Sequence, residues 1–156
     1  MLDEYIFSDL KDFNPKKKVM PIPERDDIEA DYSFQPNGKP VYLFGVKDVA
    51  KARLATLSYQ AYLLENIKYH GWVVTENFEA LPRKDKLRLT NICDKQFTSL
   101  DEFKMKARPF LEKERLELKS SYQQFINLWI FCHSCFDIGF MNYCFWVNIS
   151  VIVPLW

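Results

Sequence analysis

The chain has 156 residues and a mass of 18.6 kDa, and its 21 lysines and arginines balance its 21 aspartates and glutamates. This length is enough for one domain with a hydrophobic core and too short for two domains of ordinary size. A net charge of zero excludes a strong overall attraction to nucleic acids or anionic membranes, so nucleic-acid binding would require a local patch. The N-terminus is acidic and lacks the apolar core of a signal peptide, which predicts a cytoplasmic protein. The four cysteines lack the even spread of a secreted disulfide framework, so we expect reduced thiols.

Charge divides the chain into two parts. Residues 125–156 contain one acid, Asp137, and no lysine or arginine, whereas residues 1–124 carry all the other charges. This division predicts three segments: a lead-in helix and loop at residues 1–29, a mixed α/β core domain at residues 30–124, and an apolar C-terminal tail.

The lead-in segment has one helical pattern and one irregular stretch. Its apolar positions at roughly helical spacing are Tyr5, Ile6, Leu10 and Phe13. Asp3 is a candidate N-cap for this short helix. Residues 14–29 have prolines and no hydrophobic period, so we expect an extended loop. The lysines at positions 16–18 are candidate phosphate contacts, although such a run is more often a solvated surface.

A β-hairpin is predicted at residues 30–46. The runs at residues 30–34 and 41–46 are rich in tyrosine, phenylalanine and valine, and a Pro-Asn-Gly sequence between them supplies the turn. The second run is apolar at nearly every position, which is typical of a central strand that is covered on both faces.

A helix is predicted next, with Asp48 as its N-cap and an end near Gly71. Its apolar positions have the spacing of an amphipathic helix, and they are Leu54, Leu57, Ala61 and Leu64. Residues 72–74 then begin a third strand. A strand, a helix and a strand in this order predict a parallel right-handed crossover within a mixed sheet.

Two further helices are predicted in the charged part of the chain. Pro82 suits the first turn of a short helix. Ser99 and Glu102 have the spacing of a capping box, in which each side chain satisfies a free backbone N–H at the start of a longer helix. Pro109 is expected to kink that helix or to divide it in two.

The predicted hairpin, helix and strand resemble the common core of the PD-(D/E)xK nucleases, which have the restriction-endonuclease-like fold. In that family an Asp on the first hairpin strand and a Glu-x-Lys on the second hold Mg²⁺, which polarises the phosphate and generates hydroxide. Asp31 and Lys47 match the Asp and the Lys, whereas Gly45 stands at the position of the Glu. Gln60 is placed like the glutamine of the RecB-type branch, although Leu64 stands where that branch has a tyrosine.

This resemblance implies a site of the following residues. Asp31, Lys47 and Gln60 would be catalytic, and Asp31 would bind Mg²⁺ together with Glu76, which follows the third strand and could replace the missing carboxylate. A single carboxylate holds Mg²⁺ poorly, because the ion requires several oxygens in octahedral geometry. No cofactor is therefore expected unless the chain is a nuclease. The alternative is that Asp31 and Lys47 form an ordinary pair at the strand edge.

A second resemblance covers residues 36–114. The segments GKPVYLFGVKDVAKARLAT and VVTENFEALPRKDKLRLTNICDKQFTSLDEF are similar to the uncharacterised bacterial family called domain of unknown function 1829. That family commonly follows a domain of type 1828 in a longer polypeptide. The resemblance implies a bacterial or phage-linked protein in a mobile-element or phage-defence setting, and it transfers no catalytic residues.

The apolar tail contains Cys132, Cys135 and Cys144 among aromatic residues. A structural zinc site needs four ligands, usually from two paired knuckles, so buried unreactive thiols are the preferred interpretation. Three interpretations of residues 125–156 stay open. They are a membrane span, in which Asp137 would be costly, a helix and strand that complete the core, and a sequence translated in a shifted frame.

Three functional hypotheses follow from these patterns. The first is a non-catalytic, restriction-endonuclease-like module that binds nucleic acid or a partner protein. The second is an Mg²⁺-dependent nuclease that uses Asp31, Lys47 and Gln60, with Glu76 in the metal site. The third is an accessory protein attached to a membrane through residues 125–156.

Overall fold

The computed structural model describes residues 2–37 and 39–116, which all lie within one compact unit, Met1–Leu118. The predictions for the tail at residues 125–156, including its cysteines and the membrane span, lie outside the described residues. Within the described ranges, no helix is long and apolar enough to cross a membrane.

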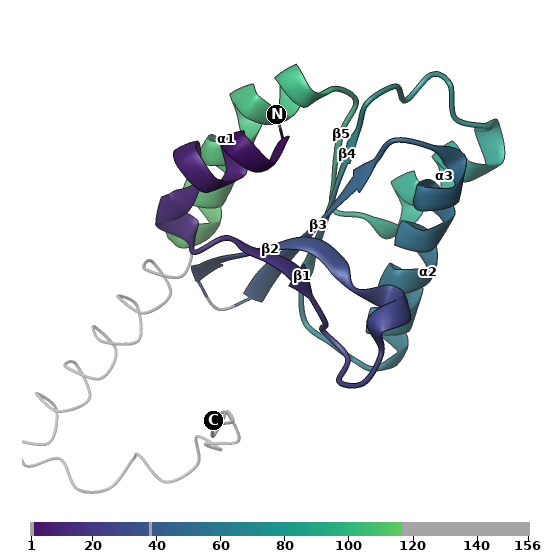
Figure 1. The fold of residues 1–156 in the computed structure, drawn as a ribbon, viewed down its shortest axis with the longest axis horizontal. Coiled ribbons are helices and arrows are strands. Elements are labelled where there is room, and N and C mark those ends of the chain that lie inside the picture. The colour runs from purple at the N-terminus through teal and green to yellow at the C-terminus, as the bar shows by residue number, and fades with distance from the viewer. Residues whose placement is uncertain (1, 38, 117–156) are drawn as a thin grey trace, which may run out of the picture. The chain divides into compact units, whose positions relative to one another are not determined.

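A mixed sheet of five strands forms the centre of the fold (Figure 1). The strands are β1 (Lys16–Val19), β2 (Ala30–Asn37), β3 (Lys39–Val46), β4 (His70–Thr75) and β5 (Lys95–Phe97), and they lie side by side in chain order. β1, β2 and β3 pair antiparallel, whereas β3, β4 and β5 pair parallel. The predicted hairpin, the central position of β3 and the parallel pairing of β3 with β4 are confirmed.

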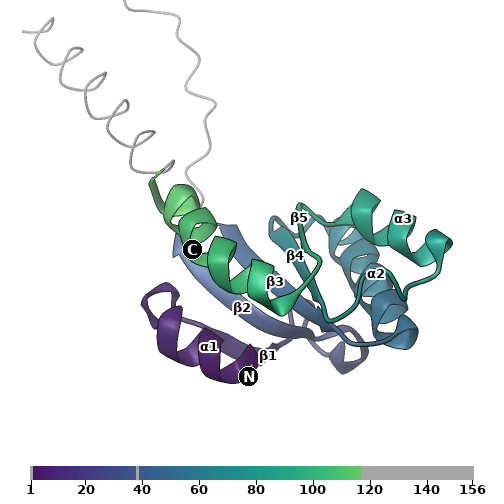
Figure 2. The ribbon, with the colours of Figure 1, turned by 90° about the horizontal axis from the view of Figure 1, so that it is seen from above.

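Helices cover both faces of the sheet. The helical elements are α1 (Leu2–Asp9), α2 (Val49–Leu64), α3 (Arg83–Ile92), a helix at residues 100–116, and 3₁₀ turns at Lys11–Phe13 and Asp26–Ile28. α1 and the helix at residues 100–116 lie on one face, and α2 and α3 lie on the other (Figures 1 and 2). The α/β class, with a small mixed sheet flanked by helices, is therefore confirmed. α3 begins directly after Pro82, as predicted.

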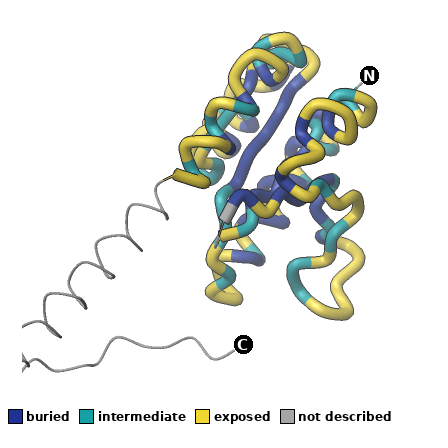
Figure 3. The backbone as a smooth tube through the Cα atoms, turned by 90° about the vertical axis from the view of Figure 1, so that its left-hand side faces the viewer, coloured by how far each residue is buried: buried dark blue, intermediate teal, exposed yellow. Residues whose placement is uncertain are grey.

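The alternation of side chains along β3 explains why this strand is apolar throughout. Val41 and Leu43 point into the core under α1, whereas Tyr42, Phe44 and Val46 point into the core under α2. Successive side chains of a strand face opposite sides of the sheet, so a strand covered on both sides needs apolar residues at every position. In Figure 3 the strands at the centre are accordingly buried, and the outer sides of the helices are exposed.

The first 29 residues contribute to this fold. Ile6, Leu10 and Phe13 are buried in the core under α1. The expected loop at residues 14–29 is wrong for β1, because these residues pair with β2 along the sheet edge. The pairing is set by contacts with a distant segment, so no local hydrophobic period predicts it.

The predicted N-cap of α2 is confirmed, and its end differs from the prediction. The Oδ1 atom of Asp48 accepts the backbone N–H of Lys51 at 2.8 Å. α2 ends at Leu64, and Gly71 lies inside β4 instead of ending the helix. Close packing explains the glycine, because a Cβ atom at this position would lie 3.1 Å from the ring of Tyr59.

α2 packs on the sheet with a face that its leucine spacing does not indicate. The buried positions are Ala52, Ala55, Thr56, Ser58, Tyr59 and Tyr62. Leu57 and Leu64, which belong to the predicted apolar stripe, are 59% and 82% exposed. Tyr59 and Tyr62 favour the observed orientation, since their buried hydroxyls donate to backbone carbonyl oxygens of neighbouring segments.

The helix at residues 100–116 begins with the expected cap. The Oγ atom of Ser99 accepts the N–H of Glu102 at 3.1 Å, and the Glu102 carboxylate accepts the N–H of Thr98 at 2.7 Å. This pair differs from a standard capping box because the glutamate reaches one residue further back. The helix continues through Pro109 without interruption, so the predicted division into two helices is wrong.

The cap gives a prediction about acid stability. Hydrogen bonds from Lys106 and from the backbone N–H of Thr98 lower the pKa of Glu102 from its ordinary value of 4.5 to about 2. The folded state therefore holds this carboxylate ionised, and its stabilising effect is present above pH 4.5 and lost as the pH falls to about 2. We expect Glu102→Gln to flatten the fall of melting temperature in this range, measured by circular dichroism. Parallel profiles for the variant and the wild type would contradict the prediction.

Candidate functional site

A hollow of about 310 Å³ lies where β3 and β4 end. Its charged lining residues are Lys17, Lys18, Glu29, Asp31, Lys47 and Glu76. β3 and β4 are parallel, so their carboxyl ends meet at the same edge of the sheet. Crevices at this edge are the usual location of ligand sites in open α/β sheets.

Three of the four predicted site residues line this hollow. Asp31 comes from β2, Lys47 directly follows β3, and Glu76 directly follows β4. Gln60 is exposed on α2 and is not among the lining residues. Gly45 also lines the hollow, and a Cβ atom there would lie 4.0 Å from the Oδ2 atom of Asp31. The position that the nuclease resemblance assigns to a glutamate therefore lies beside Asp31 but carries no side chain.

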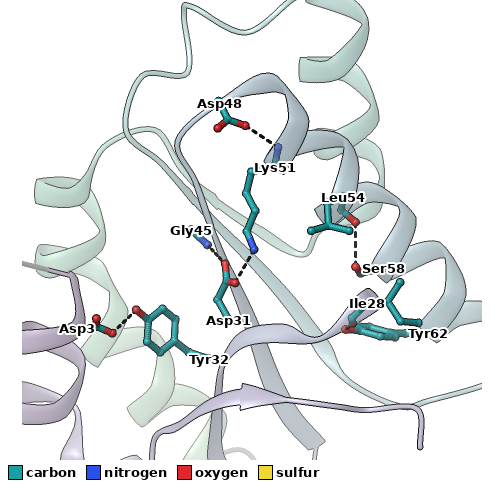
Figure 4. A network of polar contacts seen from close by, with 10 residues as sticks. All are labelled: Asp3, Ile28, Asp31, Tyr32, Gly45, Asp48, Lys51, Leu54, Ser58 and Tyr62. Carbon is teal, nitrogen blue, oxygen red and sulfur yellow. Dashed lines mark hydrogen bonds and ion pairs between the residues drawn. The ribbon is translucent and has the colours of Figure 1, made fainter. Parts of the chain in front are cut away.

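Both carboxylate oxygens of Asp31 have partners within the protein (Figure 4). Oδ1 lies 2.6 Å from the Nζ atom of Lys51, and Oδ2 accepts the backbone N–H of Gly45 at 2.9 Å. The side chains of Asp31 and Lys51 are only 24% and 23% exposed. The Lys51 ammonium also lies 5.5 Å from the ring centroid of Phe44. Asp31 is thus neutralised by a lysine from α2, and not by Lys47.

A second ion pair engages another lysine of the hollow. Lys17 contacts the Asp3 carboxylate at 2.8 Å, and the hydroxyl of Tyr32 donates to the same carboxylate. These two hydrogen bonds lower the pKa of Asp3, whereas burial and the Asp3 carboxylate raise the pKa of Tyr32. Lys17 therefore connects β1 to α1, and its charge is partly balanced.

Four charged side chains of the hollow have no such partner. Lys18, Lys47, Glu29 and Glu76 form no ion pair with any residue in the described part of the chain. Lys18 also has a left-handed backbone with φ of 53°, although it lies inside β1. The hollow therefore offers two unpaired ammonium groups and two unpaired carboxylates.

Three helices begin at or near the hollow. Leu2 and Leu100, the first residues of α1 and of the helix at residues 100–116, are lining residues, and α2 begins two residues after Lys47. Aligned backbone dipoles place a partial positive charge at the start of a helix. Acids already offset this charge at each helix: Asp3 and Glu4 lie in the first turn of α1, Asp48 caps α2, and Glu102 lies at the capped start of the helix at residues 100–116. The unpaired lysines, and not the helix N-termini, are therefore the cationic groups of the hollow.

The described carboxylates do not fit Mg²⁺ as they stand. Mg²⁺ requires near-octahedral oxygen ligands, and both oxygens of Asp31 are already bound by Lys51 and Gly45. Across residues 2–37 and 39–116, no group of three or more His, Cys, Asp or Glu side chains is arranged to hold a metal ion. The residues named by the nuclease resemblance, Asp31, Lys47 and Glu76, lie around one hollow at the expected edge of the sheet. Among the described residues they do not form a metal site.

Sequence reasoning identified part of this site. It singled out Asp31, Lys47 and Glu76, and it named the lysines at positions 16–18 as candidate phosphate contacts. It missed Glu29, which has no motif, and Lys51, whose role depends on how α2 packs beside β2. Lys51 and Asp31 are twenty residues apart in the chain, so no local spacing of residues predicts that they pair.

Comparison with protein-family models, curated proteins and solved structures gives no match for this chain. Functional conclusions therefore depend on the arrangement of the hollow and of the surfaces around it.

Proposed function

We propose that the chain is a non-catalytic nucleic-acid-binding module whose hollow takes one nucleotide unit of a strand. The observation that carries this proposal is the neutralisation of Asp31 by Lys51 and by the N–H of Gly45. Because of these contacts, the carboxylate that a PD-(D/E)xK nuclease needs as a metal ligand is already bound within the protein. Lys18 and Lys47 remain as unpaired cations at the hollow.

The charges of the hollow match the groups of a nucleotide. A phosphodiester carries one negative charge that Lys18 and Lys47 can bind. Glu29 and Glu76 can accept hydrogen bonds from sugar hydroxyls or from base amino groups. A volume of about 310 Å³ is at the small end of ligand pockets, which suits a single nucleotide.

We also infer that the fold is restriction-endonuclease-like. The order of elements supports this inference: the hairpin of β2 and β3 carries Asp31 and ends at Lys47, and α2 then leads to the parallel strand β4. This is the order on which the resemblance to the PD-(D/E)xK nucleases rests.

Anisotropy of a fluorescein-labelled single strand of about 15 nucleotides, measured in EDTA, tests the proposal. We expect Lys47→Met to weaken binding about fivefold and to reduce the slope of log affinity against log salt by about 0.7, because one phosphate is no longer neutralised. Lys39→Met is the matched control, since Lys39 lies at the opposite end of β3. Wild-type protein that does not bind in EDTA, or equal losses of affinity for both variants, would reject the proposal.

The left-handed backbone at Lys18 gives a separate prediction. This conformation costs a non-glycine residue about 1 kcal/mol, whereas glycine adopts it freely. We expect Lys18→Gly to be at least as stable as the wild type in urea and to bind the labelled strand several-fold more weakly. Lys16→Gly in the same strand is the control, and it should lower stability by roughly 0.5–1 kcal/mol. A loss of stability in Lys18→Gly equal to that in the control would contradict this prediction.

A second candidate function is a divalent-metal-dependent nuclease. The observation that favours it is the presence of Asp31, Lys47 and Glu76 around one hollow. Incubation of the protein with plasmid and Mg²⁺ or Mn²⁺ separates the two functions. Cleavage that Lys47→Ala abolishes would replace the binding proposal with this one.

A further inference from the structure

The outward face of α2 carries leucines that are exposed on the surface of the described part of the chain. Leu57 and Leu64 are two of the most exposed large apolar side chains, Leu54 beside them is half-buried, and Ala61 packs in part against the core under α2. These four residues recur at spacings of three, four and three, which is the pattern of a helix that packs against another helix. α2 therefore presents a leucine ridge, Leu57 and Leu64, on the side that faces away from the sheet.

α3 extends this surface. α2 and α3 lie side by side (Figure 1). The guanidinium of Arg53 contacts the buried Asp85 carboxylate of α3 at 3.2 Å. Leu87 of α3 is 53% exposed, so this helix adds another apolar side chain to the outer layer. We call the exposed side of the two helices the α2–α3 face, defined by Arg53, Leu57, Leu64, Arg83, Leu87 and Arg88.

The α2–α3 face is basic. The two helices contain six lysines and arginines and one acid, Asp85. Lys51 and Lys86 are paired with acids outside these helices. Arg53 and Arg88 share the single Asp85 carboxylate, so one of their two charges stays unbalanced. Arg83 and Lys84 add two more cations that form no ion pair with a described residue.

We propose that the α2–α3 face docks an acidic amphipathic helix of a partner protein. The leucine ridge would pack against the apolar side of that helix, and the surrounding arginines would face its acids. A second copy of this chain is a poorer occupant, because it would bring two basic faces together. A nucleic-acid backbone would match the charge but would leave the leucines without an apolar partner.

Synthetic helices of about 20 residues provide the probe. One has leucines along one side and glutamates on its flanks, and its twin has lysines in place of the glutamates. We expect fluorescence anisotropy to show binding of the acidic peptide and at least tenfold weaker binding of the basic twin. Leu57→Ser and Leu64→Ser should each weaken binding of the acidic peptide by roughly tenfold. Met105→Ser, at an equally exposed apolar residue of another helix, is the matched control and should have no effect.

Four outcomes would overturn this proposal. The peptides could bind equally well, or the leucine variants could bind like the control. Sedimentation could detect a wild-type dimer that Leu57→Ser dissociates, which would make a second copy the occupant. The labelled nucleic-acid strand could compete with the acidic peptide. Lys47→Met should leave peptide binding unchanged, which separates this surface from the hollow.

Discussion

Tyr59→Ala is expected to lower the free energy of unfolding by about 4 kcal/mol. The Tyr59 side chain is completely buried between α2 and the sheet. Its ring stacks on Tyr69 with centroids 5.5 Å apart and meets the edge of Phe44 at 5.0 Å. Removing the ring leaves a cavity between rigid elements, and the neighbouring side chains then lack the van der Waals attraction of the ring, which explains a penalty of this size.

A companion variant separates packing from hydrogen bonding. The Tyr59 hydroxyl lies 2.8 Å from the carbonyl oxygen of Tyr42 and 2.7 Å from that of Trp72, in the adjacent strands β3 and β4. Tyr59→Phe keeps the ring and removes this donor, so we expect the free energy of unfolding to fall by about 1 kcal/mol. Urea unfolding measures both changes in the free energy of unfolding, provided that the m-value, its slope against urea concentration, is the same for each variant and the wild type. Equal decreases for the two variants would contradict the packing argument.

Asp31→Ala is expected to lower stability without weakening nucleic-acid binding. The variant leaves the half-buried Lys51 ammonium and the Gly45 N–H without their acceptor, which should lower the free energy of unfolding by about 2 kcal/mol. It also removes a negative charge from the lining of the hollow. We therefore expect the Asp31→Ala variant to bind the labelled single strand in EDTA at least as tightly as the wild-type protein does.

The result for Asp31 also separates the two candidate functions. In a metal-dependent nuclease this carboxylate is a metal ligand, so its removal would abolish activity and weaken metal-dependent binding. Asp27→Ala is the control, because Asp27 forms an exposed ion pair with Arg25 and its removal should have no measurable effect on stability. Loss of strand binding in Asp31→Ala, with the protein still folded, would contradict the proposal that binding does not require the Asp31 carboxylate.

The hollow and the α2–α3 face differ in the chemistry that a partner would need to bind them. The hollow offers unpaired lysines and glutamates, and the α2–α3 face offers exposed leucines on helices that also carry arginines. A protein that uses both would hold a nucleic-acid strand at one surface and an acidic helix at another. The resemblances to the PD-(D/E)xK nucleases and to domain of unknown function 1829 stay predictions.

Local chemistry in the sequence was enough to predict several elements. Asp48 was identified as a cap because the capping interaction spans three residues, and it accepts the N–H of Lys51 as expected. The uninterrupted apolar run of β3 indicated a strand with two covered faces, since side chains alternate along a strand. The hairpin and the parallel crossover followed from turn chemistry and from the order of elements.

Tertiary structure alone decided the remaining features. β1 exists because it pairs with β2, and the buried face of α2 is the one that carries Tyr59 instead of Leu57. Lys51, instead of Lys47, neutralises Asp31, because α2 starts beside β2 at the edge of the sheet. Each of these features depends on contacts between segments that are distant in the chain. The spacing of residues within one segment predicts its period and its caps, but it does not determine which face meets which neighbour.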